Sequence, residues 1–320
     1  MQLVQNYKAK FQELKEDKQF ANDRRKAARI SKKVILGLFK AVVLIGISYM
    51  ILSPLLGMLS KSFFTDNDVY NPMVYLFPIE GTFERYATSL KVMSYGKVLL
   101  FTIIYDVTLM AVQLLICSLV GYGFARFNFP LKKVLFACVV VMIVLPMNTI
   151  MVPLYMTFRD FEPFGNLLST PVPMYIMTLF GCGLRSGLYI YIFNQFFRGL
   201  PKEIEEAAFV DGAGMFYTYS RIMLVNAMPS VITVSIFSLV WQYNDSFYSR
   251  MFTISADILL SKKIGSLSDT IANSYKINDP TILQLYTYAG VILMIIPVML
   301  IYVLLQRKFI EGVERSGIVG

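Results

Sequence analysis

The chain has 320 residues, of which 56% are hydrophobic and only 16% are charged, and its formal net charge is +9. A soluble domain normally carries about a quarter of charged residues. The apolar residues are gathered in runs of about 20 or more, the length that crosses a bilayer as a helix. Composition therefore indicates an all-α integral membrane protein and argues against a soluble globular domain.

Two classes of function are disfavoured by composition. Histidine is absent and the three cysteines, Cys117, Cys138 and Cys182, lie inside apolar runs. We therefore expect no catalytic residue, no metal site and no cofactor bound by this chain, and we do not expect an enzyme. The basic residues cluster at the ends of apolar runs and do not form a base-reading module, so no nucleic-acid partner is expected.

Residues 1–33 form a polar arm that precedes the first apolar run. About thirty polar and charged positions are too many for the basic region of a cleavable signal peptide. The spacing of Leu3, Val4, Tyr7, Phe11 and Leu14 is helical, and such a helix would lie on the membrane or on a partner. We favour the other interpretation, a solvated, partly ordered extension.

Six apolar runs follow, and they predict a six-helix transmembrane domain over residues 34–308 with a tail at 309–320. The runs are Val34–Leu59, Val98–Phe124, Val134–Phe158, Pro173–Phe197, Ile222–Trp241 and Ile282–Leu305. Pro146 and Pro153 interrupt the third run, and Pro229 lies inside the fifth. Breaks at Pro146 and near Gly183 would suit the lining of a cavity.

The basic residues predict the orientation. Four segments fall on one side of a six-span topology, and all are rich in Lys or Arg: residues 1–33, 126–133, 198–221 and 307–308. Because Lys and Arg are retained on the cytoplasmic side, both termini are predicted to be cytoplasmic. The polar stretches at 61–97 and 244–280 are then external loops.

The segment from Leu200 to Gly214 carries the most specific pattern. Pro201 suits the first turn of a short helix, and Glu203, Glu205 and Glu206 follow where the helix dipole favours acidic residues. Ala207 and Ala208 offer a small-residue face for close approach, and Gly212 permits a sharp turn. The sequence predicts a short helix and a bend on the cytoplasmic side.

This pattern resembles the Glu-Ala-Ala (EAA) loop of permease subunits of ATP-binding-cassette (ABC) importers, matched here by Glu206, Ala207, Ala208 and Gly212. In that family the loop, here about residues 198–221, forms a coupling helix that docks into a cleft of the ATPase. The resemblance implies coupling residues Glu205, Glu206, Ala207, Ala208, Asp211 and Gly212. The family's later proline falls at Val225, which leaves the local helix bend open.

Further segments resemble the carbohydrate branch of that family, in particular maltose-type permeases. They are Gly121–Phe127, Leu145–Tyr155, Phe196–Pro201, Trp241–Asp245 and Gln306–Gly312. The resemblance implies the type I importer fold in a bacterial cytoplasmic membrane. It implies these partners: a second permease as heterodimer, two copies of an ATPase that binds ATP and Mg, an extracellular sugar-binding protein, and a sugar or oligosaccharide as substrate. The chain has no phosphate-binding loop of its own.

Polar residues inside the runs are the candidate contacts of the substrate path, because such groups face a bundle interior or a watery path. They are Asp106, Asn148, Arg185, Asn226, Tyr243 and Asn244. The alternative for each is an interhelical hydrogen bond or an ion pair, and Asp106 and Arg185 are one such pair. Gln113 is a further polar residue in the second run.

Two other functions stay open at this point. An ABC permease for a solute other than a sugar would share the EAA loop. An ion-coupled secondary transporter would need a carboxylate deep in the spans, and Asp106 is the one good candidate for it.

Overall fold

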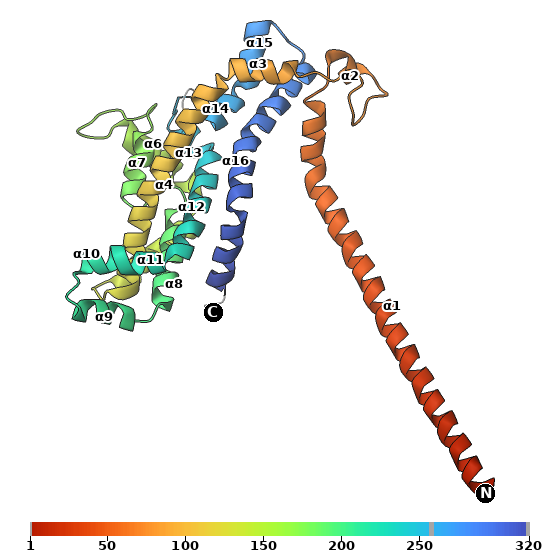
Figure 1. Ribbon diagram of the computed structural model, residues 1–320. Coiled ribbons are helices and arrows are strands. Elements are labelled where there is room, and N and C mark those ends of the chain that lie inside the picture. Colours follow the sequence, from red (N-terminus) through yellow and green to blue (C-terminus); the bar gives the residue numbers. More distant parts are fainter. Residues whose placement is uncertain (1, 256–258, 318–320) are drawn as a thin grey trace. The chain divides into compact units, whose positions relative to one another are not determined.

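The computed structural model describes residues 2–255 and 259–317, and these residues contain helices and no strand. The chain divides into two units, one up to Ser60 and the other from Lys61 onward, and each is described by itself. The helices (Figure 1) are α1 Gln2–Lys61, α2 Asp66–Tyr70, α3 Glu84–Val92, α4 Tyr95–Arg126, α5 Lys132–Val144, α6 Met147–Arg159, α7 Val172–Leu179, α8 Ser186–Gly199, α9 Glu203–Val210, α10 Met215–Tyr217, the π-helix η1 Thr218–Met223, α11 Leu224–Asn226, α12 Met228–Tyr243, α13 Phe247–Met251, α14 Leu260–Gly265, α15 Leu267–Tyr275 and α16 Pro280–Gly317.

The first unit consists of α1. Its polar arm and its apolar run form one uninterrupted helix, so the arm is helical as its periodicity predicts. The portion from Lys32 to Lys61 is long and apolar enough to cross a membrane. Side chains along it are exposed, as at Met50 with 76% of its surface accessible. Such a surface is suited to contact with lipid.

Three helices in the described residues are long and apolar enough to span a membrane by themselves: Lys32–Lys61, Tyr95–Arg126 and Pro280–Leu304. Two bent pairs bring this to as many as five, if each pair is one span. The predicted runs at 134–158 and 222–241 are therefore not single helices, because each consists of two helices that meet at a sharp angle. The predicted run at 173–197 is divided between the short helices α7 and α8. The count of six spans stays a prediction.

Each break has a local cause. Helices α5 and α6 meet at 104° at Leu145–Pro146, where proline removes a donor and favours an extended residue before it. Between α7 and α8, Gly181 and Arg185 adopt positive φ angles of 71° and 61°. The breaks predicted at Pro146 and near Gly183 are thus confirmed, whereas α6 continues through Pro153.

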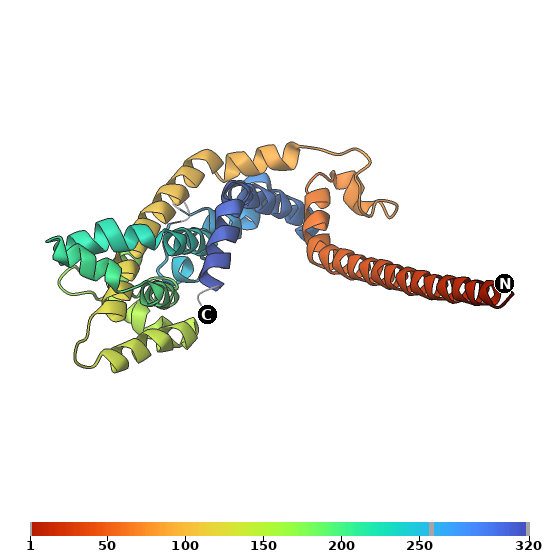
Figure 2. The same cartoon turned by 60° about the horizontal axis from the view of Figure 1, so that its bottom comes forward.

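The second unit is assembled around α4. In both views this helix runs along the unit, and α8, α7 and α12 pack against it while α16 packs against α12 (Figures 1 and 2). Helices α4 and α8 approach closely at Gly121, where an added Cβ would lie 2.6 Å from Phe193 Cβ and 3.1 Å from the Asn194 nitrogen. Close approach of membrane helices at small residues is a recurrent packing mode.

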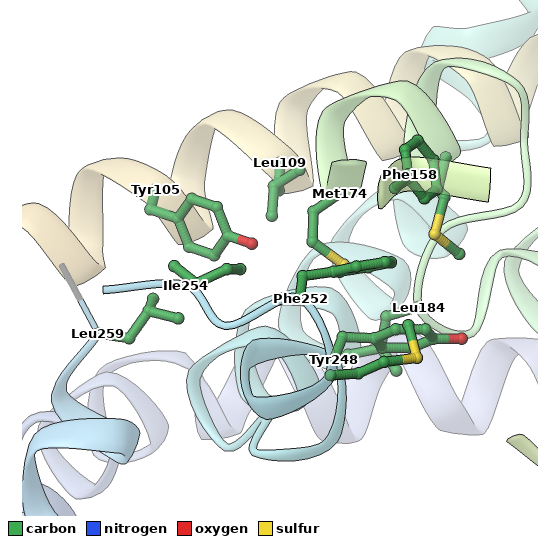
Figure 3. Close-up of a cluster of buried hydrophobic side chains, with 11 residues drawn as sticks. Tyr105, Leu109, Phe158, Met174, Leu184, Tyr248, Phe252, Ile254 and Leu259 are labelled. Atoms are coloured by element: carbon green, nitrogen blue, oxygen red, sulfur yellow. The ribbon is translucent and has the colours of Figure 1, made fainter. Parts of the chain in front are cut away.

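A cluster of buried hydrophobic side chains packs the segments around the helix breaks against α4. Figure 3 shows Tyr105 and Leu109 of α4 facing side chains from α6, α7 and the segment that follows α12. Phe252 is fully buried there, and its ring lies 5.3 Å from that of Phe158 in an edge-to-face arrangement. Aromatic contacts of this kind add to the burial of apolar area. The loops around the breaks are thereby held to the rigid part of the unit.

The contact at Gly121 can be tested with a matched neighbour. Gly121→Ala should destabilise the unit by about 1–3 kcal/mol, because the extra methyl overpacks α4 against α8. Gly123→Ala is the control, since a Cβ at Gly123 meets nothing within 4 Å. That change should be neutral or stabilise by about 0.5–1 kcal/mol through helix propensity. Thermal unfolding of both purified variants measures the difference, and equal melting temperatures would contradict it.

Candidate functional site

The segment with the EAA pattern forms the short helix α9, and its end has a defined geometry. Gly212 follows the helix with φ of +82°, and its N–H donates to the Phe209 carbonyl at 3.0 Å. The N–H of Ala213 donates to the Ala208 carbonyl at 2.9 Å. This pair of bonds is the Schellman arrangement, which favours glycine at the left-handed position. The bend predicted at Gly212 is confirmed.

Helix α9 has an inner and an outer face. Glu205 and Ala208 are buried at 7% and 4% exposure, while Glu206, Ala207 and Asp211 are exposed. The predicted coupling residues therefore do not share one face. Glu205 and Ala208 attach the helix to the rest of the unit, and the others lie on the outside.

Glu205 is held by two residues of the last turns of α4. Tyr122 Oη donates to Glu205 Oε1 at 2.5 Å, and Arg126 Nε lies 2.9 Å from Oε2. Arg126 also donates through Nη2 to the Leu200 carbonyl, at 2.8 Å, just before α9. The side chains of Arg126 and Glu205 are only 6% and 9% exposed. A buried, charge-assisted pair of this kind fixes the position of α9 against α4.

The π-helix η1 is fixed to the same part of α4. The hydroxyls of Tyr219 and Ser118 are 2.6 Å apart, and the ring of Tyr219 lies 5.3 Å from that of Tyr122. Short π-helical segments are frequent at functional sites. The following helix bends by 78° at Ala227, although the family's proline is replaced by Val225. The helix bend is therefore present at Ala227, two residues after the position of the family's proline.

The outer side of this end of the unit is apolar. Large side chains of α9 and α10 are strongly exposed: Phe209 44%, Val210 87%, Met215 66%, Phe216 72% and Tyr217 58%. We call these five residues the α9–α10 patch. Exposed apolar groups that are gathered on a surface mark sites of contact with another protein or with a membrane.

The different faces of Glu205 and Glu206 predict different effects of substitution. Glu205→Ala leaves the Arg126 charge buried without its partner and should destabilise the unit by about 3–5 kcal/mol. Glu206→Ala removes an exposed side chain and should change stability by less than about 0.5 kcal/mol. Thermal unfolding in detergent compares the two. A larger loss in the Glu206 variant would show that the inner and outer faces are assigned wrongly.

A cavity of 560 Å³ lies where the two helix breaks meet. Its walls include Pro146 from one break, Gly183 and Arg185 from the other, and Tyr248. The Arg185 guanidinium stacks on the Trp241 ring at 4.3 Å from the ring centroid. Stacking of this type orients a guanidinium without neutralising its charge. Arg185 is the one predicted substrate-path residue that lines this cavity.

Gln113 holds the break between α7 and α8 in place. This fully buried side chain donates from Nε2 to the Leu184 carbonyl at 2.7 Å and to Ser186 Oγ at 2.9 Å. Its Oε1 accepts from Ser238 Oγ at 2.7 Å and faces Gln242 Nε2 at 3.5 Å. One amide thus joins α4, the break and α12. Its polarity inside an apolar run was the available signal, but its partners could not be inferred from sequence.

Asp106 and Tyr243 lie elsewhere, at a smaller cavity of 70 Å³ between α4, α12 and α16. Tyr243 donates to the Met294 carbonyl at 2.9 Å, which matches the structural alternative given for it. Asp106 is 2% exposed, and its carboxylate oxygens have no hydrogen-bond partner among the described residues. The suggested pair between Asp106 and Arg185 is therefore wrong, since Arg185 stacks on Trp241.

The three asparagines predicted to line the substrate path are exposed. Asn148 lies in the first turn of α6 beside Pro146. Asn226 donates to the Ile222 carbonyl in η1, and Asn244 donates to the Val240 carbonyl in α12, both at 2.8 Å. The six predicted substrate-path residues therefore do not form one cluster within this chain.

Comparison with known proteins identifies relatives of the whole membrane domain. Residues 117–315, more than half of the chain, match the family described as binding-protein-dependent transport system inner membrane component. The "Probable ABC transporter permease protein" of Pyrococcus horikoshii is 29% identical over 84% of this chain and 92% of its own length. The melibiose/raffinose/stachyose import permease protein MelC of Bacillus subtilis is 27% identical over 77% of this chain and 84% of its own.

The fold has a match among solved structures. A chain in the crystal structure of a bacterial ABC transporter involved in the import of the acidic polysaccharide alginate superposes with a TM-score of 0.70. The match covers 86% of this chain and 96% of the other, at 20% sequence identity. The second unit and its helix breaks therefore belong to the fold of an ABC importer permease.

Proposed function

We propose, from the premise that this chain belongs to the family of binding-protein-dependent transport system inner membrane components, that it forms half of the translocation path of an ATP-driven sugar importer. The named relatives that import melibiose, raffinose and stachyose support the sugar class. The carbohydrate-type segments at Gly121–Phe127 and Leu145–Tyr155 support the same class. The chain itself would not hydrolyse ATP.

The observation that carries this proposal is the exposed α9–α10 patch beside the bend at Gly212. Glu205 attaches α9 on its inner face, while Phe209 and Val210 are exposed on the outside beside Glu206 and Asp211. Such a helix is suited to transmit force from a second protein. We assign that second protein as a cassette ATPase, present in two copies, which binds ATP and Mg. Glu206, Ala207, Asp211 and Gly212 would contact it, whereas Glu205 and Ala208 would position the helix.

The proposal includes six spans and two cytoplasmic termini. The three long helices and the two bent pairs supply five candidate spans, and α7 with α8 would supply the sixth. The segments at 126–133 and 198–221 then lie on one side with both ends of the chain. An extracellular sugar-binding protein would deliver the solute to the opposite side, at the 61–97 and 244–280 segments.

The path itself would run along the cavity at the helix breaks. Arg185 and Tyr248 both line this cavity and would offer a guanidinium donor and an aromatic ring, the two kinds of contact that sugars use. Exposed Asn148, Asn226 and Asn244 would face the path or the second permease subunit. Movement of α9 would reach the cavity through α4, because α4 binds both Glu205 and the break at Leu184.

Substitution at Gly212 tests the coupling role. Gly212→Val should reduce uptake at least tenfold, because a β-branched residue at φ of +82° costs about 1–2 kcal/mol and would reshape the end of α9. Gly212→Asn is the control, since asparagine tolerates this conformation and there is free space around the position. The measurement is sugar uptake into membrane vesicles that contain equal amounts of each variant. Full uptake by the valine variant would refute the coupling role.

Purification from native membranes tests the assembly. A pull-down of the gently solubilised chain should recover a second permease and a cassette ATPase, and the attached binding protein can then be screened against oligosaccharides. Recovery of the chain alone, in a form that transports after reconstitution and responds to an uncoupler, would instead favour an ion-coupled transporter. Buried, unpartnered Asp106 would then be its candidate coupling residue.

A further inference from the structure

The N-terminal arm carries its charge in an uneven way. Residues 1–23 contain four lysines and four acidic residues, which balance. Residues 24–33, with the sequence RRKAARISKK, contain six basic residues, and no Asp or Glu occurs between Arg24 and Thr65. We call residues 24–33 the basic segment. The net positive charge of the arm is therefore concentrated in the ten residues that directly precede the apolar run.

If the apolar run of α1 spans the bilayer, helix geometry sets the distance of the basic segment from the hydrocarbon core. Helix α1 continues without interruption from Gln2 to Lys61, so the basic segment and the apolar run at 34–59 are parts of one rod. Ten helical residues cover about 15 Å. The headgroup layer adds roughly 5–8 Å to each side of the hydrocarbon core. Lys32 and Lys33 therefore enter the headgroup layer, and the remaining basic residues lie within about one Debye length of it.

Five of the six basic residues, all except Arg24, also share one side of the helix. At 3.6 residues per turn, positions 25, 26, 29, 32 and 33 fall within about a third of the circumference. Lys40, at the start of the apolar run, falls on the same side and can extend to the headgroups. The acidic residues of the distal arm, Glu13, Glu16, Asp17 and Asp23, fall on the opposite side.

We propose that the basic segment is a binding site for the headgroups of anionic phospholipids, such as phosphatidylglycerol, which hold α1 at a fixed depth and rotation. A basic cluster directly beside a membrane span attracts anionic lipids. The one-sided arrangement on an uninterrupted helix would collect these lipids along one face. This inference is independent of the transported solute and of the ATPase partner.

The test is the binding of phosphatidylglycerol to the purified full chain in detergent, measured by native mass spectrometry with phosphatidylcholine as the reference lipid. The variant Arg25→Gln, Arg29→Gln, Lys32→Gln, Lys33→Gln should lose the preference for phosphatidylglycerol at least about tenfold. Because the chain is in detergent, a change in its membrane orientation does not affect this measurement. A variant with unchanged preference would overturn the proposal.

The distal arm provides a control of equal charge. The variant Lys8→Gln, Lys10→Gln, Lys15→Gln, Lys18→Gln also removes four positive charges, and it should bind phosphatidylglycerol within about twofold of the unmodified chain. Equal losses in the two variants would show a non-specific charge effect and refute a local site. With the unmodified chain, added salt should weaken phosphatidylglycerol binding selectively. Salt-independent binding, or cross-linking of the basic segment to another protein in place of lipid, would also refute the proposal.

Discussion

Helix α4 is the element on which the second unit depends, because close packing and buried polar contacts both converge on it. Gly121 lets α8 approach until a methyl group would not fit. Along the same helix, Thr102 accepts from the Leu260 N–H at 2.9 Å, Gln113 binds the break between α7 and α8, and Tyr122 binds Glu205. A single helix thereby connects one end of the unit to the other through directional bonds.

Some of these hydrogen bonds pair backbone groups that a bilayer would leave unsatisfied. Inside a bilayer, a broken helix leaves carbonyls and N–H groups that water cannot satisfy, so other protein groups must bind them. Gln113 supplies this for Leu184, and a packed aromatic cluster excludes lipid around Phe252. Arg185 then lies in the wall of a largely apolar cavity, directly after a residue whose carbonyl is paired with Gln113.

The sequence predicts the elements with strong local signals. The apolar run at 98–124 is helix α4 to within three residues at either end, and Gly212 adopts the left-handed conformation that the motif requires. Pro146 and the glycines near Gly183 locate two breaks, since proline and glycine act on the backbone at their own positions. These features depend on residues that are close in sequence, so they can be predicted from the sequence.

The remaining features depend on contacts between distant residues, which local patterns do not contain. Glu205 and Glu206 are adjacent residues of the same type, yet only Glu205 contacts Tyr122 and Arg126. Likewise, charge alone suggested that Arg185 pairs with Asp106, but the folded chain places it on Trp241. Pro146 marked the position of the break in the run at 134–158, but the run itself did not give the 104° angle between α5 and α6.

Exposed apolar surface has two different meanings in this chain. Along α1 and α4 it covers helices long enough to span a membrane, so lipid is its natural partner. The α9–α10 patch instead lies on short helices beside exposed Lys202, Glu206 and Asp211, where charged groups are not surrounded by hydrocarbon. An apolar patch among exposed charges is suited to another protein surface, which can meet both kinds of group. Since Glu205 fixes α9 from within, any protein that binds this patch acts directly on α4.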